Sequence, residues 1–360
     1  MTITSVRVAN LRRFENAEFK TESRLNLIFG QNGSGKTSLL EAIHILHAGK
    51  SFRSSSSTEL IRHGANGLAV HGNVAGYPED SSLSMEIRVV KTRERTDISV
   101  DGSPISSASE LARIYPLIVL DPNSFGVVDG TPKLRRSLID RTLFHVEPKF
   151  FATTRRFQKA LHQRNQLLKA PRIGAEIFFW ESELAVAGQE IDSSRKKCVA
   201  ELNNLLATHH GDPRGNVELC YRPGWDDAIS LHLAYEQFRA KEQEHGSTLY
   251  GPHKGEVTIS VSGRKAAKIL SRGETKSLIV NIIAAIARHV MDVSKKTPVI
   301  LADDLPAELD YQACKRAFDT LAETKAQVFV TALALANFPL DRFPSEIRKF
   351  HVEQSAVHDI

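Results

Sequence analysis

Residues 30–37, Gly-Gln-Asn-Gly-Ser-Gly-Lys-Thr, match the spacing GxxxxGK[ST] in full. The apolar run Leu25–Phe29 before them predicts a buried strand, and apolar residues after them recur at helical spacing, at Leu39, Leu40, Ile43 and Leu46. A glycine-rich loop between a strand and a helix presents successive backbone N–H groups and the positive end of the helix to phosphate groups. The motif therefore predicts an α/β fold with a nucleotide-phosphate site, and leaves a structural glycine turn as the alternative.

The loop as a whole is expected to bind ATP. The residues that we expect to contact the nucleotide are Gly30, Gln31, Asn32, Gly33, Ser34, Gly35, Lys36 and Thr37. Lys36 would neutralise oxygens of the β- and γ-phosphates, and the Thr37 hydroxyl would ligate Mg²⁺.

An apolar run that ends in two carboxylates, Val299–Asp304, supplies the acidic partner of this loop. By position Asp303 is the second Mg²⁺ ligand, and Asp304 is placed to orient or deprotonate an attacking water. Two aspartates after a strand are otherwise often a turn or a helix cap. The phosphate loop upstream favours the catalytic interpretation over the cap.

The distance along the chain between these motifs points to a large insertion. Thr37 and Asp303 are 266 residues apart, more than a compact kinase or a small GTPase needs. Apolar residues step by three and four within 150–168 and again within 177–205, with a break at Pro171 and Gly174. This pattern predicts an antiparallel helical hairpin whose second helix has about 30 residues and is about 45 Å long.

Just before the acidic strand, Leu270-Ser271-Arg272-Gly273-Glu274 resembles the LSGGQ signature of ABC-type ATPases. Ser271 and the N–H groups of a helix start can contact a γ-phosphate, and Gly273 permits a close approach. The alternative is an ordinary N-cap with Glu274 as its capping-box partner. In ABC-type ATPases, phosphate loop and signature face each other across two heads. Because this chain carries one of each, the resemblance implies an ATP-dependent homodimer.

Several longer segments resemble the RecF family, an SMC-like branch of the ABC ATPases, over nearly the whole chain. They are residues 48–54, 130–140, 163–169, 251–254 and 270–273. The resemblance implies ATP-dependent binding to double-stranded, gapped or junction DNA, with a weak, DNA-stimulated ATPase activity that serves as a switch. It also implies cooperation with RecO and RecR in loading RecA during gap repair and the SOS response.

The resemblance also assigns residues outside the three motifs. Arg12 and Arg13 match residues near the nucleotide, although a surface pair is an equal alternative. Glu308-Leu309-Asp310 stands in the place of the D-loop, and Thr331 in the switch position where many relatives carry His. Glu274 replaces the usual Gln of the signature, and Ala307 replaces a common Ser of the D-loop.

Basic residues of the inserted region are candidates for DNA contacts. They are Arg135, Arg136, Arg141, Lys149, Arg155, Arg156 and Lys159. A solvated helix face explains each of them equally well. Contacts from such residues go mostly to phosphates, so binding is expected to depend on salt more than on sequence.

Composition agrees with a cytoplasmic protein that has a polyanionic partner. The formal net charge is +5, and the three cysteines, Cys198, Cys220 and Cys314, have neither disulfide-framework nor zinc-site spacing. The N-terminus lacks the apolar core of a signal peptide. The apolar stretch 278–287 falls short of the roughly 18 residues that cross a bilayer, so no membrane association is expected.

Together these observations predict an α/β fold: a P-loop ATPase head of the ABC/SMC-like type, with an antiparallel β meander ending at the Asp101–Gly102 turn and an inserted helical hairpin arm. The expected parts are residues 1–130 (first part of the ATPase lobe), 131–250 (helical arm) and 251–360 (signature, Walker B and D-loop). An ABC-type energy-coupling subunit and a P-loop small-molecule kinase are the alternative functions. A long-armed SMC protein would need coiled-coil heptads, which are absent from the sequence.

Overall fold

The computed structural model describes residues 2–54, 56–76, 84–208, 215–307, 309–339 and 347–360. The chain forms two compact units: unit 1 comprises Met1–Phe125 and Ser271–Ile360, and unit 2 comprises Gly126–Leu270. Unit 2 is thus an insertion into unit 1 along the sequence. The division into three parts with boundaries after residues 130 and 250 stays a prediction.

Unit 1 contains a six-stranded, mainly parallel sheet in the order β15-β14-β3-β13-β12-β8. Its strands are β3 (Leu25–Phe29), β8 (Leu117–Leu120), β12 (Val299–Ala302), β13 (Gln327–Ala332), β14 (Ile347–Glu353) and the antiparallel edge strand β15 (Ala356–Asp359). All residues of β12 and β13 are buried, as their continuous apolar runs predict. These two strands pair in parallel.

The register of this sheet brings three chain segments together at one edge. Ile28 of β3 lies opposite Thr331 of β13, and Ala302 of β12 lies opposite Val330. The strands are parallel, so their carboxyl ends point the same way. The loops that follow β3 and β12 are therefore neighbours, although 266 residues separate Thr37 from Asp303.

The second sheet of unit 1 is antiparallel, in the order β2-β1-β4-β5-β6-β7. Its strands are β1 (Thr2–Leu11), β2 (Phe14–Lys20), β4 (Gly67–Ala75), β5 (Ser84–Thr92), β6 (Thr96–Val100) and β7 (Ser103–Pro104). The predicted meander and its Asp101–Gly102 turn are confirmed, with positive φ angles of 48° and 76° at the two turn residues. Leu83, which stands at the start of the alternating apolar and polar run of β5, lies outside the described residues.

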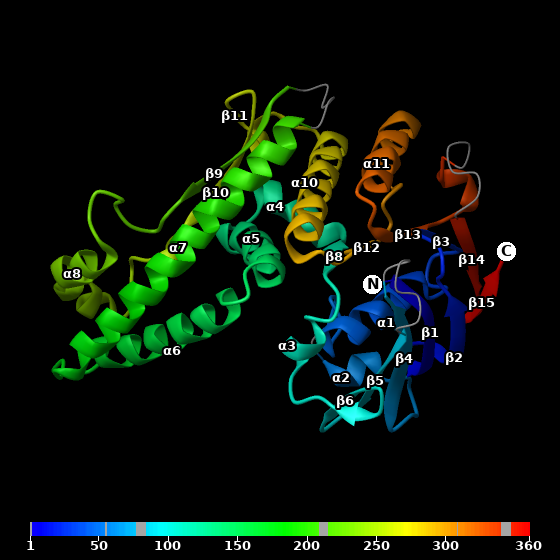
Figure 1. Cartoon of the computed structure of the whole chain (residues 1–360), viewed down its shortest axis with the longest axis horizontal. Helices are drawn as coiled ribbons and strands as arrows, with labels where there is room; N and C mark the ends of the chain where they lie inside the picture. Colours follow the sequence, from blue (N-terminus) through cyan, green and yellow to red (C-terminus); the bar gives the residue numbers. More distant parts are fainter. Residues whose placement is uncertain (1, 55, 77–83, 209–214, 308, 340–346) are drawn as a thin grey trace. The chain divides into compact units, whose positions relative to one another are not determined.

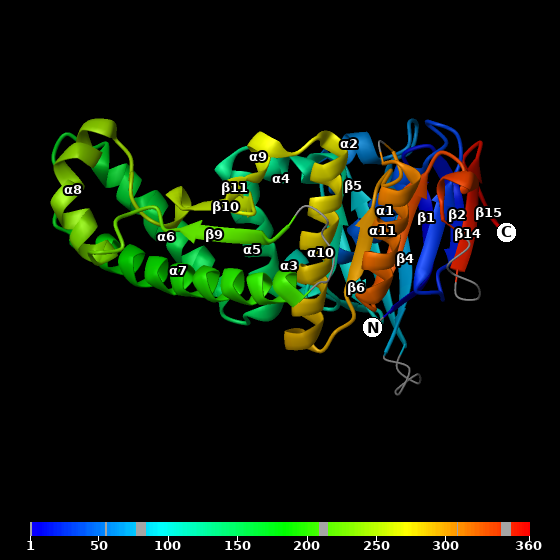
Figure 2. The same ribbon diagram turned by 90° about the horizontal axis from the view of Figure 1, so that it is seen from above.

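One helix lies between the two sheets. Helix α1 (Lys36–Ala48) contributes Leu39 and Ile43 to a core that also contains Val70 of the antiparallel sheet and Phe329 of the parallel sheet. Helix α1 contacts β1 and β4 of the antiparallel sheet and β13 of the parallel sheet. Figure 1 shows it beside β1 and β4, and Figure 2 shows these strands from above. The core therefore fixes the first turn of α1, where the phosphate loop ends.

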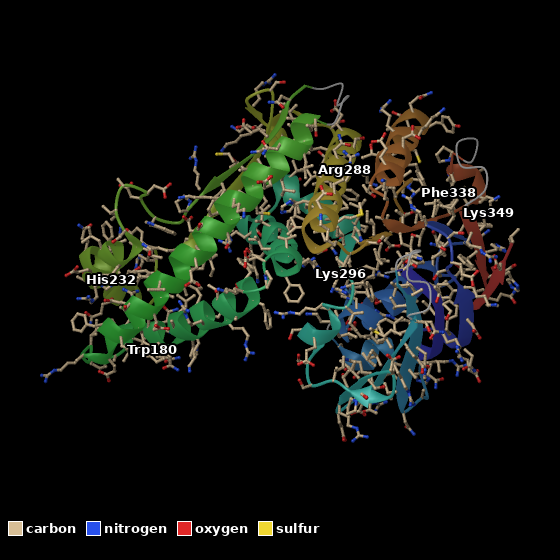
Figure 3. All side chains as sticks on the ribbon, viewed as in Figure 1. Trp180, His232, Arg288, Lys296, Phe338 and Lys349 are labelled. Carbon is tan, nitrogen blue, oxygen red and sulfur yellow. The ribbon has the colours of Figure 1, made fainter. Side chains whose placement is uncertain are left out.

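The other helical segments of unit 1 are short, apart from two. They are α2 (Ser57–Leu60), α3 (Ala108–Leu111), α10 (Arg272–Ser294), α11 (Tyr311–Glu323) and 3₁₀ turns at Pro122–Phe125 and Leu335–Asn337. Helices α10 and α11 run side by side and are joined by an ion pair of 2.9 Å between Arg288 and Glu323; Figure 3 labels Arg288 on α10.

Among the described residues, α10 alone is long and apolar enough to cross a membrane by length and composition. Leu278, Ile282 and Val290 of this helix are completely buried in the protein. Such burial is typical of a core helix, which passes the same test.

Unit 2 is built around the predicted helical hairpin (Figure 1). Helix α6 (Phe150–Leu168) and the 33-residue helix α7 (Glu176–Thr208) pack against each other along their lengths, which confirms the prediction. The remaining elements are α4 (Gly126–Asp129), α5 (Pro132–Val146), α8 (Leu231–His245), α9 (Ala266–Ile269), a 3₁₀ turn at Pro252–Lys254, β9 (Val217–Arg222), β10 (Glu256–Val261) and β11 (Arg264–Lys265).

Candidate nucleotide site

The phosphate loop turns from β3 into α1 through backbone conformations that favour glycine. Gly35 has φ +118°, and a Cβ at this position would lie 2.7 Å from the ring of Phe14. Gly30 has φ +154°, and a Cβ there would lie 2.2 Å from the carbonyl oxygen of Val352. Side chains other than hydrogen clash or strain the chain at both positions. The turn itself therefore requires the glycine spacing of the motif.

Lys36 lies across this loop. Its Nζ donates hydrogen bonds to the carbonyl oxygens of Gly30 (2.8 Å) and Gln31 (3.0 Å). Burial lowers the pKa of Lys36, and the negative charges of Asp304 and Asp303 oppose that shift. The Ser34 hydroxyl in the same loop is buried without a hydrogen-bond partner among the described residues. Leaving a buried hydroxyl without a hydrogen bond is costly. The Ser34 hydroxyl therefore favours an oxygen-rich ligand that would hydrogen-bond to it beside Lys36.

The two predicted metal ligands, Thr37 and Asp303, are hydrogen-bonded to each other. The Thr37 hydroxyl donates to the two carboxylate oxygens of Asp303 at 2.9 and 3.1 Å. Asp303 is only 9% exposed, and burial raises the pKa of its carboxyl, against the hydrogen bonds from Thr331 and Thr37 that favour the ionised form. A hydroxyl and a buried carboxylate at one point are oxygen donors of the kind that hard divalent cations prefer. This pair therefore fits a magnesium ion.

Asp304, the predicted water-orienting residue, follows Asp303 with a left-handed backbone, φ +54°. Its backbone N–H donates to the Thr331 hydroxyl at 2.7 Å, and that hydroxyl donates to Asp303 Oδ1 at 2.8 Å. Thr331 is completely buried. The structure thus brings Lys36, Thr37, both aspartates and Thr331 together at the carboxyl edge of the parallel sheet.

Arg12 and Arg13 are placed differently from each other. Arg12 donates to both carboxylate oxygens of the fully buried Glu41, at 3.0 and 2.7 Å. Arg13 donates to the carbonyl oxygen of Gly33 in the phosphate loop at 2.8 Å. Arg13 is therefore adjacent to the loop, whereas the Arg12 guanidinium is engaged with α1. Their roles at the nucleotide stay predictions.

One cation near the site was not singled out from the sequence. The positive charge of Arg53 opposes the rise in the pKa of Asp303, so its guanidinium lies within electrostatic reach of that carboxylate. Arg53 follows Ser51, whose hydroxyl donates to Glu41 at 2.6 Å and accepts from the Arg53 N–H at 2.9 Å. Its position within the RecF-like segment 48–54 was the available signal.

The signature segment begins α10 at the protein surface. Ser271 is the N-cap: its hydroxyl accepts from the Glu274 N–H at 3.4 Å, and the Glu274 carboxylate accepts from the Ser271 N–H at 2.8 Å. The capping box, the alternative to the signature, is thus formed. The box explains Glu274 at this position. Ser271, Arg272 and Glu274 of this first turn are exposed, and Gly273 is half-buried.

The segment predicted to be the D-loop is hydrogen-bonded, through Ala307, to the helix that begins at the predicted signature. Lys276, one turn into α10, donates to the carbonyl oxygen of Ala307, and its ammonium lies 4.9 Å from the centre of the Phe125 ring. Asp310 caps α11 by accepting from the Ala313 N–H at 2.7 Å. Glu308 lies outside the described residues.

The candidate DNA-contacting residues of unit 2 fall into two groups. Arg135 pairs with Glu256 at 2.8 Å and is 11% exposed in its side chain, and Arg136 donates to the Gly255 carbonyl oxygen at 2.6 Å. These two are engaged with the start of β10 and the residue before it. The exposed members are Arg141, Lys149, Arg155, Arg156 and Lys159.

Comparisons with known proteins agree on one family. The model of the family "RecF/RecN/SMC N terminal domain" matches residues 2–344. A curated protein named "DNA replication and repair protein RecF" from Shewanella pealeana is 33% identical over 359 residues, 99% of either chain. Its namesake from Vibrio campbellii is 31% identical over 360 residues, 99% of this chain and 100% of the relative.

Solved structures are similar in fold. A structure of "the recombination mediator protein RecF-ATPrS in RecFOR pathway" matches with a TM-score of 0.86 at 21% identity, over 99% of this chain and 98% of that chain. An Smc head bound to the C-winged helix domain of ScpA matches with a TM-score of 0.57 at 17% identity, over 100% of this chain and 97% of that chain. The predicted fold class is confirmed by these matches.

Proposed function

This chain belongs to the RecF family of SMC-like ABC ATPases, and we propose from that membership that it is an ATP-binding DNA-repair protein whose nucleotide site acts as a switch. The relatives are named for DNA replication and repair. The two alternatives, an energy-coupling subunit and a small-molecule kinase, lose their support because those relatives match along 99% of this chain.

The observation that carries this proposal is the contact of 2.9 Å between Thr37 and Asp303. In the proposed site, the loop N–H groups and Lys36 hold the β- and γ-phosphates, and Thr37 with Asp303 would hold Mg²⁺. The metal ion supplies neutralisation of charge on the phosphate oxygens. Asp304 orients the attacking water or accepts its proton.

Closure of the site needs a second chain. Ser271 and Gly273 lie on the outer end of α10, where the helix N–H groups can face the γ-phosphate bound by another copy. Two chains would then enclose two ATP molecules in a homodimer. Slow hydrolysis would open the dimer, so the dimer would stay closed only while ATP is bound.

DNA is the proposed partner of the closed state. The net charge of +5 and the exposed cations of α5 and α6 suit phosphate contacts on double-stranded, gapped or junction DNA. Such contacts would stimulate the weak ATPase activity by favouring the dimer. RecO and RecR are the proposed protein partners, in the cytoplasm, in promoting RecA loading.

Retention of a short gapped duplex tests this proposal. We expect tighter retention with ATP and Mg²⁺ than with ADP and Mg²⁺ or without nucleotide, and weaker retention in every state as salt rises. Intact duplex and single-stranded DNA of the same length serve as controls for DNA structure. Equal retention in all nucleotide states would contradict the switch.

A further inference from the structure

Among the residues that the structure describes, Thr331 hydrogen-bonds to both members of the acidic pair. It stands opposite Ile28 in the sheet, completely buried between β3 and β12. Its hydroxyl donates to Asp303 Oδ1 at 2.8 Å and accepts from the Asp304 N–H at 2.7 Å. A hydroxyl carries a single hydrogen to donate, so this one is fully used by Asp303.

One of the two hydrogen bonds constrains the side chain of Asp303, and the other constrains the backbone of Asp304. The bond to Asp303 restrains the rotation of a carboxylate that Thr37 also contacts, at 2.9 Å. The bond from Asp304 holds the backbone of a residue other than glycine in the left-handed region, φ +54°. The direction in which the Asp304 side chain leaves the backbone follows from that φ angle.

A ligand role for Thr331 itself does not fit this geometry. Its side chain is buried and its donor is already paired, so it has no hydrogen left to offer to a phosphate. The position that many ABC ATPases give to histidine is therefore occupied here by a group that acts on its neighbours.

We propose that Thr331 is a positioning residue that orients Asp303 toward the metal ion and Asp304 toward the attacking water. This inference rests on the proposed function of the site as a magnesium-dependent ATPase. It predicts that the hydroxyl contributes to the gain in nucleotide affinity that Mg²⁺ provides, and contributes little to the binding of free ATP by the phosphate loop.

The test compares Thr331→Val, which removes the hydroxyl at nearly constant size, with Thr331→Ser, which keeps it. Thr331→Ala is a second hydroxyl-free variant, in case valine disturbs folding. The matched control is Thr21→Val, because Thr21 is another fully buried threonine of unit 1 that donates to a backbone carbonyl, that of Ile3, at 2.6 Å. The affinity for a fluorescent ATP analogue is measured for each protein in Mg²⁺ and in EDTA.

For the hydroxyl-free variants we expect the ratio of the two affinities to fall on the order of tenfold, which is what one hydrogen bond to a charged group contributes. Affinity in EDTA should stay unchanged. The turnover number of ATP hydrolysis should fall by at least a similar factor, and KM in Mg²⁺ should rise with the loss of Mg²⁺-dependent affinity. Thr331→Ser and Thr21→Val should match the wild type in all three readouts.

An unchanged Mg²⁺/EDTA ratio and turnover number in folded Thr331→Val or Thr331→Ala protein would overturn the inference. Equal losses of affinity in Mg²⁺ and EDTA would also overturn it, because they indicate a general structural defect. Failure of the proposed function would be seen separately, as a wild-type protein that binds no nucleotide in either condition.

Discussion

At the scale of single residues, the site depends on charges that the fold brings close together. Lys36 is held by two loop carbonyls while Asp303 and Asp304 lie near enough to raise its pKa against the effect of burial. The phosphate groups of a nucleotide would add negative charge at the same place, so the ammonium would exchange neutral carbonyl acceptors for charged ones. Charge-assisted hydrogen bonds of that kind are the stronger ones.

Lys36→Ala should therefore weaken ATP binding by about 1.5–3 kcal/mol, on the order of 10- to 150-fold in the dissociation constant. The fold should persist, because water can replace the hydrogen bonds that Lys36 donates to the carbonyl oxygens of Gly30 and Gln31. Isothermal titration with ATP in EDTA measures the change, with Lys20→Ala on the exposed edge of β2 as the control. An unchanged dissociation constant would exclude the assigned role of Lys36.

The sequence predicted these residues because they belong to local motifs. The Thr37–Asp303 contact was also predictable, since a phosphate loop and an acidic strand end have known positions in one sheet. The contact of Arg12 with Glu41 could not be predicted from the sequence. It depends on how β1 and α1 pack, which no local pattern encodes. The place of Arg53 near Asp303 is equally a product of tertiary packing.

At the scale of elements, a buried network of charges joins three helices of unit 2. Arg164 of α6 contacts Glu181 of α7 at 2.9 Å and Glu242 of α8 at 2.6 Å, and all three side chains are almost completely buried. Glu181 also pairs with Arg239 of α8 at 2.6 Å. Helical periodicity predicted the hairpin of α6 and α7 and places Arg164 in step with the apolar residues of α6. It does not identify Glu181 and Glu242 as the partners of Arg164, so the network could not be predicted.

Arg164→Met should destabilise unit 2 by about 3–5 kcal/mol, because Glu242 loses its buried counter-charge. The matched control is Arg156→Met on the same helix. Arg156 is 41% exposed and pairs with Glu190 at 3.4 Å, so its loss should cost about 0–1 kcal/mol.

Urea unfolding followed by tryptophan fluorescence measures both variants. The only two tryptophans of the chain, Trp180 and Trp225, belong to unit 2, and Figure 3 labels Trp180 on α7. The signal therefore reports this unit specifically. Equal midpoints for the two variants would mean that the buried network contributes no more than a surface ion pair.

At the scale of the whole molecule, one chain carries a phosphate loop and an outward-facing signature turn. Ser271 and Lys36 belong to the same unit, yet they stand on different helix starts, those of α10 and α1. In two copies arranged head to head, the turn at Ser271 of one chain would face the phosphate loop of the other. The proposed nucleotide-controlled switch depends on this association more than on any single hydrogen bond.

Light-scattering mass of Asp304→Asn protein, with and without ATP and Mg²⁺, tests the association most directly. This variant should bind ATP but hydrolyse it slowly, so that the closed dimer accumulates. We predict a mass of one chain without nucleotide and of two chains with ATP and Mg²⁺. Ser271→Arg in the same background, which blocks the signature turn, should remain at one chain in both conditions. A single-chain mass for Asp304→Asn at saturating ATP, or a two-chain mass that persists with Ser271→Arg, would contradict the account.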